Sequence, residues 1–291
     1  MKILLLLLSL LTFTLAKEIK IEILGSGGPE IDGRASTSYL LWVDNEAKLI
    51  VDMGSGSMLR FEESNAKIET LEAVVLTHLH IDHSVDLPAF VKAGYFSKRS
   101  AALDIIGPYA NGSFPSIGEF LEGLFGKNGV YRYMQDVLTP QSDSFEIIPI
   151  EINSNAVITR KYEDFTLKLI NVHHGSVPAL GLAILVDGKK IVISGDTDDA
   201  EKHLEKLLQN ADIFIAHHAI PEDANSFAKS LHMQPSTIAK IAQKANVKQI
   251  LLTHRMNRTI SKERETLKMM HRYYQGKIIF AKDKFIVSLS N

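Results

Sequence analysis

Residues 77–83 read Thr-His-Leu-His-Ile-Asp-His and place four side chains of metal-ligand type in seven positions: His78, His80, Asp82 and His83. They follow the apolar run Glu-Ala-Val-Val-Leu at residues 72–76, which predicts a buried strand. Imidazole and carboxylate groups bind borderline metals, and alternation along an extended chain turns His78 and His80 to one side. An isolated His-x-His pair is usually a surface accident, whereas this density of ligands predicts a metal site, with two ions plausible.

This motif resembles the His-x-His-x-Asp-His signature of the metallo-β-lactamase superfamily. The resemblance implies a third histidine, a bridging aspartate and a last histidine, in that order and each at the end of a strand. His174 in Val-His-His-Gly, Asp196 in Ser-Gly-Asp-Thr and His254 in Leu-Thr-His-Arg meet this expectation. The match runs from about Ile21 to His254 and implies an α/β (α+β) fold of four layers, the αββα sandwich.

The resemblance also implies how the ligands divide between two zinc ions, with manganese or iron as alternatives. The first ion takes His78, His80 and His174, the second takes Asp82, His83 and His254, and Asp196 bridges both. Two such ions generate a bridging hydroxide at neutral pH, and this hydroxide is the expected nucleophile. His173 competes with His174 for the ligand position, and we choose His174 because a small-residue turn follows it. Taken alone, Asp196 could be a turn residue and His254 a core histidine.

Asp196 favours one class of reaction. A bridging carboxylate suits a transition state with charge on two oxygens, as in phosphodiester hydrolysis, and the lactam-opening enzymes of the superfamily typically lack it. His232, in Leu-His-Met-Gln-Pro-Ser, further resembles the ribonuclease Z branch, in which a histidine beside the metals can protonate the leaving group. Asp82 and His232 are therefore the expected catalytic residues. A plain histidine before a helix is the simpler interpretation of His232.

This sequence differs from the pattern of the ribonuclease Z branch at one place. That branch carries a long tRNA-gripping arm between the third histidine and the bridging aspartate, whereas His174 and Asp196 are only 22 positions apart in this chain. This spacing accommodates two strands and a turn, so we expect a small anionic ester, a phosphodiester or an aryl sulfate, rather than tRNA. A β-lactam or lactone hydrolase and a non-catalytic metal-binding module are the alternatives.

Other polar residues have weaker patterns. Asp52 ends an apolar strand and is either a turn residue or, by resemblance, the carboxylate that orients a metal-bound histidine. We expect His217 and His218, at the end of a strand that leads to the same edge, to line the site or to contact its ligands rather than bind metal, and His203 and His271 to lie on surface helices. The loop Gly25-Ser-Gly-Gly28 lacks the Gly-Lys-Ser/Thr ending of a phosphate loop, so a tight turn is the better interpretation.

Strands and helices alternate in two successive halves, which fits two sheets packed face to face with helices outside. Residues 97–143 are the least regular part, with Gly107-Pro108 as a breaker and aromatic residues that suit either core packing or a lid. Further helices are predicted at residues 199–208, at 236–245 with Ser236 as N-cap, and at 261–274.

Residues 1–16 combine Lys2, an apolar run and Ala16, which is typical of a secretory signal peptide cut before Lys17. An uncut anchor is less favoured because the run is short for a bilayer. We therefore expect one domain over residues 17–291, located in the periplasm or secreted. The chain has no cysteine, which excludes disulfides and thiolate ligands.

The formal net charge is −2, so no basic field draws nucleic acid or an anionic membrane. We expect a small-molecule substrate, no nucleic acid and no membrane span after leader cleavage, while the sequence leaves the oligomeric state open.

Overall fold

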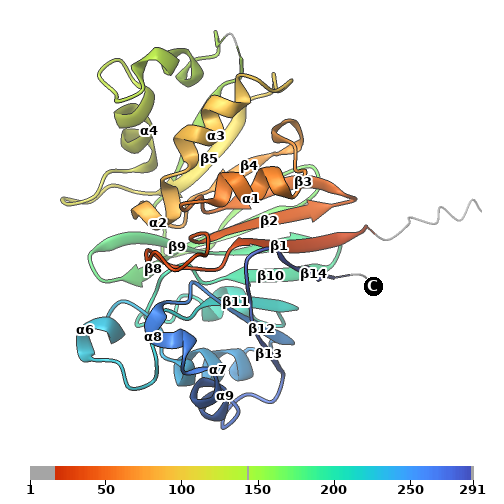
Figure 1. Ribbon diagram of the computed structural model, residues 1–291, viewed down its shortest axis with the longest axis vertical. Coiled ribbons are helices and arrows are strands. Elements are labelled where there is room, and N and C mark those ends of the chain that lie inside the picture. The colour runs from red at the N-terminus through yellow and green to blue at the C-terminus, as the bar shows by residue number, and fades with distance from the viewer. Residues whose placement is uncertain (1–16, 143, 290–291) are drawn as a thin grey trace, which may run out of the picture.

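The computed structural model describes residues 17–142 and 144–289, so the predicted leader at residues 1–16 lies outside the described part of the chain. Two seven-stranded sheets face each other, and helices cover their outer sides (Figure 1). The first sheet has the order β14-β1-β2-β3-β4-β5-β6 and the second has the order β13-β12-β11-β10-β9-β8-β7. The predicted αββα sandwich is thereby confirmed.

The first sheet is antiparallel from β14 to β3 and parallel from β3 to β6. Its strands are β1 (Ile19–Gly25), β2 (Ser38–Val43), β3 (Glu46–Val51), β4 (Ala73–Val75), β5 (Leu103–Pro108), β6 (Ile147–Ile152) and β14 (Phe285–Ser288). The central strands are nearly continuous runs of buried, mostly apolar residues, as strands covered on both faces require.

The second sheet is antiparallel from β7 to β10 and parallel from β10 to β13. Its strands are β7 (Ile158–Lys161), β8 (Thr166–His174), β9 (Val177–Val186), β10 (Lys189–Ile193), β11 (Ile213–His217), β12 (Gln249–Thr253) and β13 (Lys277–Phe280). Because β8, β10, β11 and β12 run in the same direction, their carboxyl ends meet at one edge of the sheet, where open α/β sheets generally bind ligands.

The helices fall into two groups that follow the two sheets (Figure 1). The first half contributes α1 (Ser57–Glu63), α2 (Ile81–Ser84), α3 (Leu87–Gly94), α4 (Ile117–Phe125) and the 3₁₀ helices η1 (Ile68–Thr70) and η2 (Arg132–Leu138). The second half contributes α5 (Glu205–Leu208), α6 (Ser226–Lys229), α7 (Pro235–Lys244), α8 (Asn257–Ile260) and α9 (Glu263–Met270). One apolar cluster fills the space between the sheets, and two others lie between each sheet and its helices.

Gly107 and Pro108 were predicted to break regular structure, and β5 does end at Pro108, where a missing N–H does little harm to the ladder. Two other local predictions were wrong, each for a physical reason. The helix predicted from residue 199 is reduced to α5, because Asp199 and Lys202 have positive φ angles of 56°. Ser236 is not an N-cap, because α7 begins at Pro235 and Gln234 occupies that position.

Within the described ranges, no helix has both the length and the apolar character that crossing a membrane requires.

Candidate metal centre

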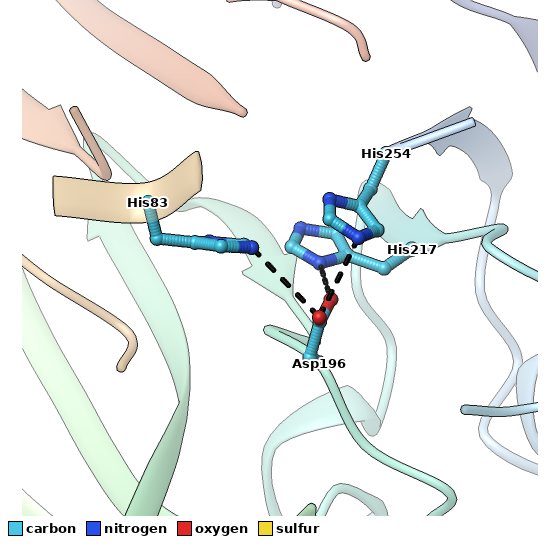
Figure 2. A group of neighbouring side chains, drawn as sticks. All are labelled: His83, Asp196, His217 and His254. Carbon is cyan, nitrogen blue, oxygen red and sulfur yellow. Dashed lines mark hydrogen bonds and ion pairs between the residues drawn. The ribbon is translucent and has the colours of Figure 1, made fainter. Parts of the chain in front are cut away.

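Six polar residues converge where the two sheets meet at the carboxyl ends of their strands. Asp196 provides the centre of the group, and its Oδ2 faces five imidazole rings. The distances from Oδ2 are 3.5 Å to His254 Nε2, 3.7 Å to His174 Nε2, 3.8 Å to His83 Nε2, 3.9 Å to His78 Nε2 and 3.9 Å to His232 Nδ1. Figure 2 shows His83 and His254 approaching this carboxylate from two different elements, α2 and the end of β12.

The ligand-type atoms form overlapping groups whose members lie within 4.8 Å of one another. One group holds His78, His80 and His174, with His78 Nε2 3.0 Å from His80 Nδ1. Another holds His83, Asp196 and His254, together with His217, which was expected to line the site or to contact its ligands. Asp82 lies beside this second group, with its Oδ2 3.6 Å from His83 Nε2. The structure thus brings the predicted ligands together in two sets that share Asp196 as neighbour.

His83 is held by a buried carboxylate. Asp52 directly follows β3 and accepts hydrogen bonds from Thr77 N at 2.7 Å, Thr77 Oγ1 at 2.9 Å and His83 Nδ1 at 2.9 Å. Asp52, Thr77 and His83 are all fully buried. Asp52 adopts a left-handed φ of 61°, a conformation that aspartate tolerates better than most residues. Of the two roles considered for Asp52, the contacts therefore match the orienting carboxylate.

Four histidines carry their proton on Nδ1, because each Nδ1 faces a group that must accept. His83 donates to Asp52, and His174 donates to the Leu231 carbonyl at 2.9 Å. The Thr37 hydroxyl donates to Gly27 O at 3.1 Å, so at 2.6 Å it accepts from His254 Nδ1. By the same logic Thr77, which donates to Asp52, accepts from His78 Nδ1 at 3.3 Å. In its neutral form each of the four rings therefore presents an Nε2 lone pair, the form that binds metal.

Backbone conformation aims the last two ligands. His254 follows β12 with φ at 49°, a left-handed conformation that is uncommon for histidine and recurs at functional sites. Gly195 precedes Asp196 with φ at 60°, and a Cβ there would lie 2.4 Å from Leu180 O. Only glycine fits this approach, so Gly195 fixes the path that carries Asp196 between the sheets.

At most positions, the electrostatics of the cluster favour the protonation state that binds metal. Burial lowers the pKa of His78 and His254 well below the usual range, which keeps them neutral. Burial opposes ionisation of Asp196, but the surrounding imidazoles and the hydrogen bond from His217 hold its pKa well below normal. Burial also opposes protonation of His83, yet Asp52 and the carboxylates across the site raise the pKa of this ring to about 9. A divalent ion replaces a proton in such a position.

His232 lies between α6 and α7, at the edge of the cluster. Its N–H donates to Ala228 O at 3.1 Å, and its ring lies 5.2 Å from that of His174. Burial lowers its pKa to about 4, so the ring is neutral at pH 7. Its Nδ1 has no hydrogen-bond partner among the described residues and faces Asp196. The expected proton donor therefore lies beside the predicted ligands, with its unpaired Nδ1 directed at the cluster.

The remaining histidines are separated by their contacts. His173 points away from the cluster and binds Asp198 Oδ1 through Nδ1 at 2.9 Å. His218 is buried next to Thr266, His203 binds Asn171 O, and His271 is exposed. His217 contacts a predicted ligand, since its Nδ1 lies 2.7 Å from Asp196 Oδ1. This agrees with one of the two roles expected from its place at the end of a strand leading to the same edge.

The arrangement fits divalent metal ions. His83 Nε2 is buried, has no hydrogen-bond partner among the described residues and points into the cluster. A buried polar atom without a partner costs free energy, and a cation at this point would satisfy it. Imidazole nitrogens with a carboxylate oxygen are the ligands that zinc and similar metals prefer. The His/Asp cluster is thus suited to hold divalent metal between the sheets.

Comparison with solved structures identifies the fold. The metallo-β-lactamase fold protein YhfI from Bacillus subtilis matches with a TM-score of 0.74 and 21% identity, over 94% of this chain and 99% of the other. The short form of human tRNase Z matches with a TM-score of 0.68 and 20% identity, over 92% of this chain and 98% of the other.

Sequence comparison adds two curated relatives and a family. Ribonuclease Z of Listeria welshimeri is 28% identical over 270 residues, covering 81% of this chain and 88% of the relative. Ribonuclease Z of Mycobacterium bovis is 29% identical over 256 residues, covering 81% and 85%. The model of the β-lactamase superfamily domain matches residues 51–255, a range that contains every predicted metal ligand. The chain therefore belongs to the β-lactamase superfamily, as a metallo-β-lactamase-fold hydrolase with ribonuclease Z-like homologues.

Proposed function

We propose that this protein is a two-metal hydrolase that cleaves a small anionic ester, a phosphodiester or a related ester such as an aryl sulfate. The observation that carries the proposal is the set of four imidazoles locked with Nε2 toward Asp196 Oδ2. This arrangement leaves His83 Nε2 buried without a hydrogen-bond partner among the described residues, which lowers the stability of the free protein. A purely structural role would not require such a loss.

The proposed ions are zinc, with manganese or iron as alternatives. His78, His80 and His174 would hold one ion, and Asp82, His83 and His254 the other, with Asp196 shared between them. When bound, two such ions supply a nucleophile from water at neutral pH and neutralise charge on the attacking and leaving oxygens. Asp82, whose Oδ2 lies 3.6 Å from His83 Nε2, would belong to the second ligand set and would receive the proton that the water loses when it ionises.

His232 is proposed to protonate the leaving oxygen. In the free protein burial lowers its pKa to about 4, so it lacks the extra proton at pH 7. An anionic ester bound beside the ring favours the imidazolium form and raises this pKa. His232 would therefore gain its proton together with the substrate, which selects anionic substrates over neutral ones.

A small substrate is favoured over tRNA by two features. The chain between His174 and Asp196 forms only β9, a turn and β10, so the arm that the resemblance implies for tRNA processing has no place there. The net charge of −2 also offers no overall attraction for a polyanion. The relatives named ribonuclease Z nevertheless point the other way, so an RNA substrate is the competing class and belongs in the test.

The experiment measures metal content and hydrolysis on one purified sample. The substrates are bis-aryl phosphate, aryl sulfate, a chromogenic lactam and a precursor tRNA. We expect two metals per chain and a preference for the phosphodiester or sulfate. Turnover of the lactam alone, preferential cleavage of the tRNA, or a single bound ion would each overturn the proposal. Two bound metals without turnover of any substrate would favour a binding module.

His232→Ala tests the proton donor directly. We expect kcat to fall by about 10²–10⁴-fold with metal content unchanged, which is the usual range for a general acid. The loss should shrink for an ester whose leaving group is a weak base and needs no proton. His271→Ala is the matched control, since His271 is exposed on the last turn after α9. Equal turnover by His232→Ala and wild type would exclude the role.

A further inference from the structure

His217 uses both of its ring nitrogens inside the protein. Its Nδ1 lies 2.7 Å from Asp196 Oδ1, and its Nε2 lies 2.8 Å from the hydroxyl of Tyr39. Figure 2 shows the His217 ring beside the Asp196 carboxylate, with the His254 ring lying over it. The His217 and His254 rings stack with centroids 4.9 Å apart and planes 16° apart.

The directions of these hydrogen bonds follow from chemistry. An ionised carboxylate can only accept, so His217 Nδ1 donates to Asp196 Oδ1. Nε2 then carries only a lone pair and accepts from the Tyr39 hydroxyl. Because the Tyr39 hydroxyl donates its single proton to His217, it accepts a hydrogen bond from Thr253 Oγ1, which lies 2.7 Å away. A one-way chain therefore runs from Thr253 through Tyr39 and His217 to Asp196, and its members are at most 3% exposed.

The same series of hydrogen bonds argues against His217 as a metal ligand. Its position among His83, Asp196 and His254 would suit a metal ligand. Yet neither nitrogen has a lone pair directed at the space that Asp196 Oδ2 faces, because one donates and the other is taken by Tyr39. The two oxygens of Asp196 are thus divided: Oδ1 contacts the protein, and Oδ2 faces the five other imidazoles.

We propose that His217 is a positioning residue that reserves Asp196 Oδ1 for the protein and leaves Oδ2 as the single oxygen shared by both metals. The inference rests on the two-metal site proposed above, but not on its substrate. Tyr39 and Thr253 extend the effect, because they fix the His217 tautomer and ring angle from β2 and β12 in opposite sheets. Orienting partners of this kind typically change metal affinity 10- to 100-fold.

Two isosteric substitutions separate the contacts of His217. The Asn side-chain amide nitrogen takes the place of Nδ1, so His217→Asn can still donate to Asp196 but cannot reach Tyr39. Gln takes the place of Nε2, so His217→Gln can reach Tyr39 but leaves Asp196 Oδ1 without its donor. Both variants lose the same ring packing against His254, so each controls for the other.

The readout is metal binding by the full chain, measured with zinc alone in competition with a chelator, and the absorption spectrum of the cobalt(II)-loaded protein. We expect His217→Gln to weaken zinc binding about 10- to 100-fold and to change the cobalt spectrum. His217→Asn should stay much closer to wild type. Equal affinities and spectra for wild type and His217→Gln, or equal losses in both variants, would overturn the assignment.

Tyr39→Phe tests the outer part of the chain. It should weaken zinc binding in the wild-type background and have no further effect in His217→Asn, where Tyr39 no longer reaches residue 217. Tyr274→Phe is the matched control, since it also removes a buried hydroxyl hydrogen bond, to Val247 O at 3.0 Å. Should His217→Gln fail to fold, a zinc affinity lowered by Tyr39→Phe but not by Tyr274→Phe supports the proposal, and equal affinities refute it.

The same measurements distinguish two kinds of failure. A wild-type chain that binds only one zinc ion would refute the two-metal site and, with it, the shared oxygen. A wild-type chain that binds two ions, with His217→Gln indistinguishable from it, would refute the role of His217 alone.

Discussion

Replacing Asp52 with asparagine should disable His83 as a ligand without disturbing the fold. Asp52 Oδ1 accepts from Thr77 N, while Oδ2 accepts from both Thr77 Oγ1 and His83 Nδ1. In Asp52→Asn the remaining oxygen can still accept from Thr77 N, but an amide N–H₂ group replaces Oδ2. The Thr77 hydroxyl can rotate to accept, whereas His83 can avoid a donor facing a donor only by moving its proton to Nε2.

The magnitude follows from this change of tautomer. A protonated Nε2 cannot bind a metal, so the second ion loses one of its nitrogen ligands or must pay for the tautomer shift. Loss of an orienting partner typically lowers metal affinity 10- to 100-fold, which corresponds to about 1.4–2.7 kcal/mol. The left-handed φ of 61° at Asp52 is one that asparagine also tolerates, so backbone strain should not add to the effect.

Zinc affinity in chelator competition and the unfolding midpoint of the metal-free protein are the two measurements. Asp52→Asn should bind one ion normally and the second more weakly, with kcat reduced in proportion to the lost second ion. Asp86→Asn serves as control, because Asp86 also accepts a backbone hydrogen bond, from Met58 N at 3.0 Å, but faces α1 rather than the histidines. Wild-type affinity for both ions in Asp52→Asn would refute the tautomer argument.

Two further predictions concern stability and pH. Burial raises the pKa of Asp199 to about 6, so the folded state holds this proton more tightly than the unfolded state, and the contribution of Asp199 to the free energy of unfolding falls as pH rises from about 4 to 6. Asp199→Asn should remove this contribution and be more stable at pH 7 by about 2–3 kcal/mol in urea unfolding; a pH dependence equal to that of wild type would contradict the assignment. Burial, aided by Arg255, lowers the pKa of His218 to about 3, so the unfolded state binds the extra proton and the contribution of His218 to stability falls as pH drops below about 6.5. Between pH 7.5 and 4.5 this contribution should change by about 3 kcal/mol, and His218→Gln but not the exposed His271→Gln should remove it from the wild-type pH profile.

The cluster of His and Asp side chains could be predicted from the sequence because its members are concentrated in short motifs. Residues 78–83 put four candidate ligands shortly after β4, and the single residues that complete the predicted set each lie at or just after the end of a strand at the same sheet edge. Local chemistry and strand direction are enough to group them. The choice of His174 over His173 agrees with the contacts, since His174 faces Asp196 and His173 binds Asp198.

The role of His217 could not be predicted in this way, because it depends on partners far away in the chain. Its contact with Asp196 spans 21 positions, and its contact with Tyr39 spans 178 positions. No local pattern links Tyr39 on β2 to His217 on β11, since the two strands belong to opposite sheets. The helix predicted at residues 199–208 was too long, because Asp199 and Lys202 adopt positive φ angles that a helix does not allow.

The packing of the two sheets against each other determines the geometry of the site. The Leu180 N–H of β9 donates to Thr77 O at 2.8 Å, and Tyr39 of β2 donates to His217 of β11, so hydrogen bonds join the sheets directly behind the histidines. Each sheet supplies only part of the predicted ligand set: the first half provides His78, His80, Asp82 and His83, and the second provides His174, Asp196 and His254. A shift of one sheet against the other would separate Asp196 Oδ2 from His83 Nε2. The inter-sheet core therefore fixes the distances on which metal binding depends.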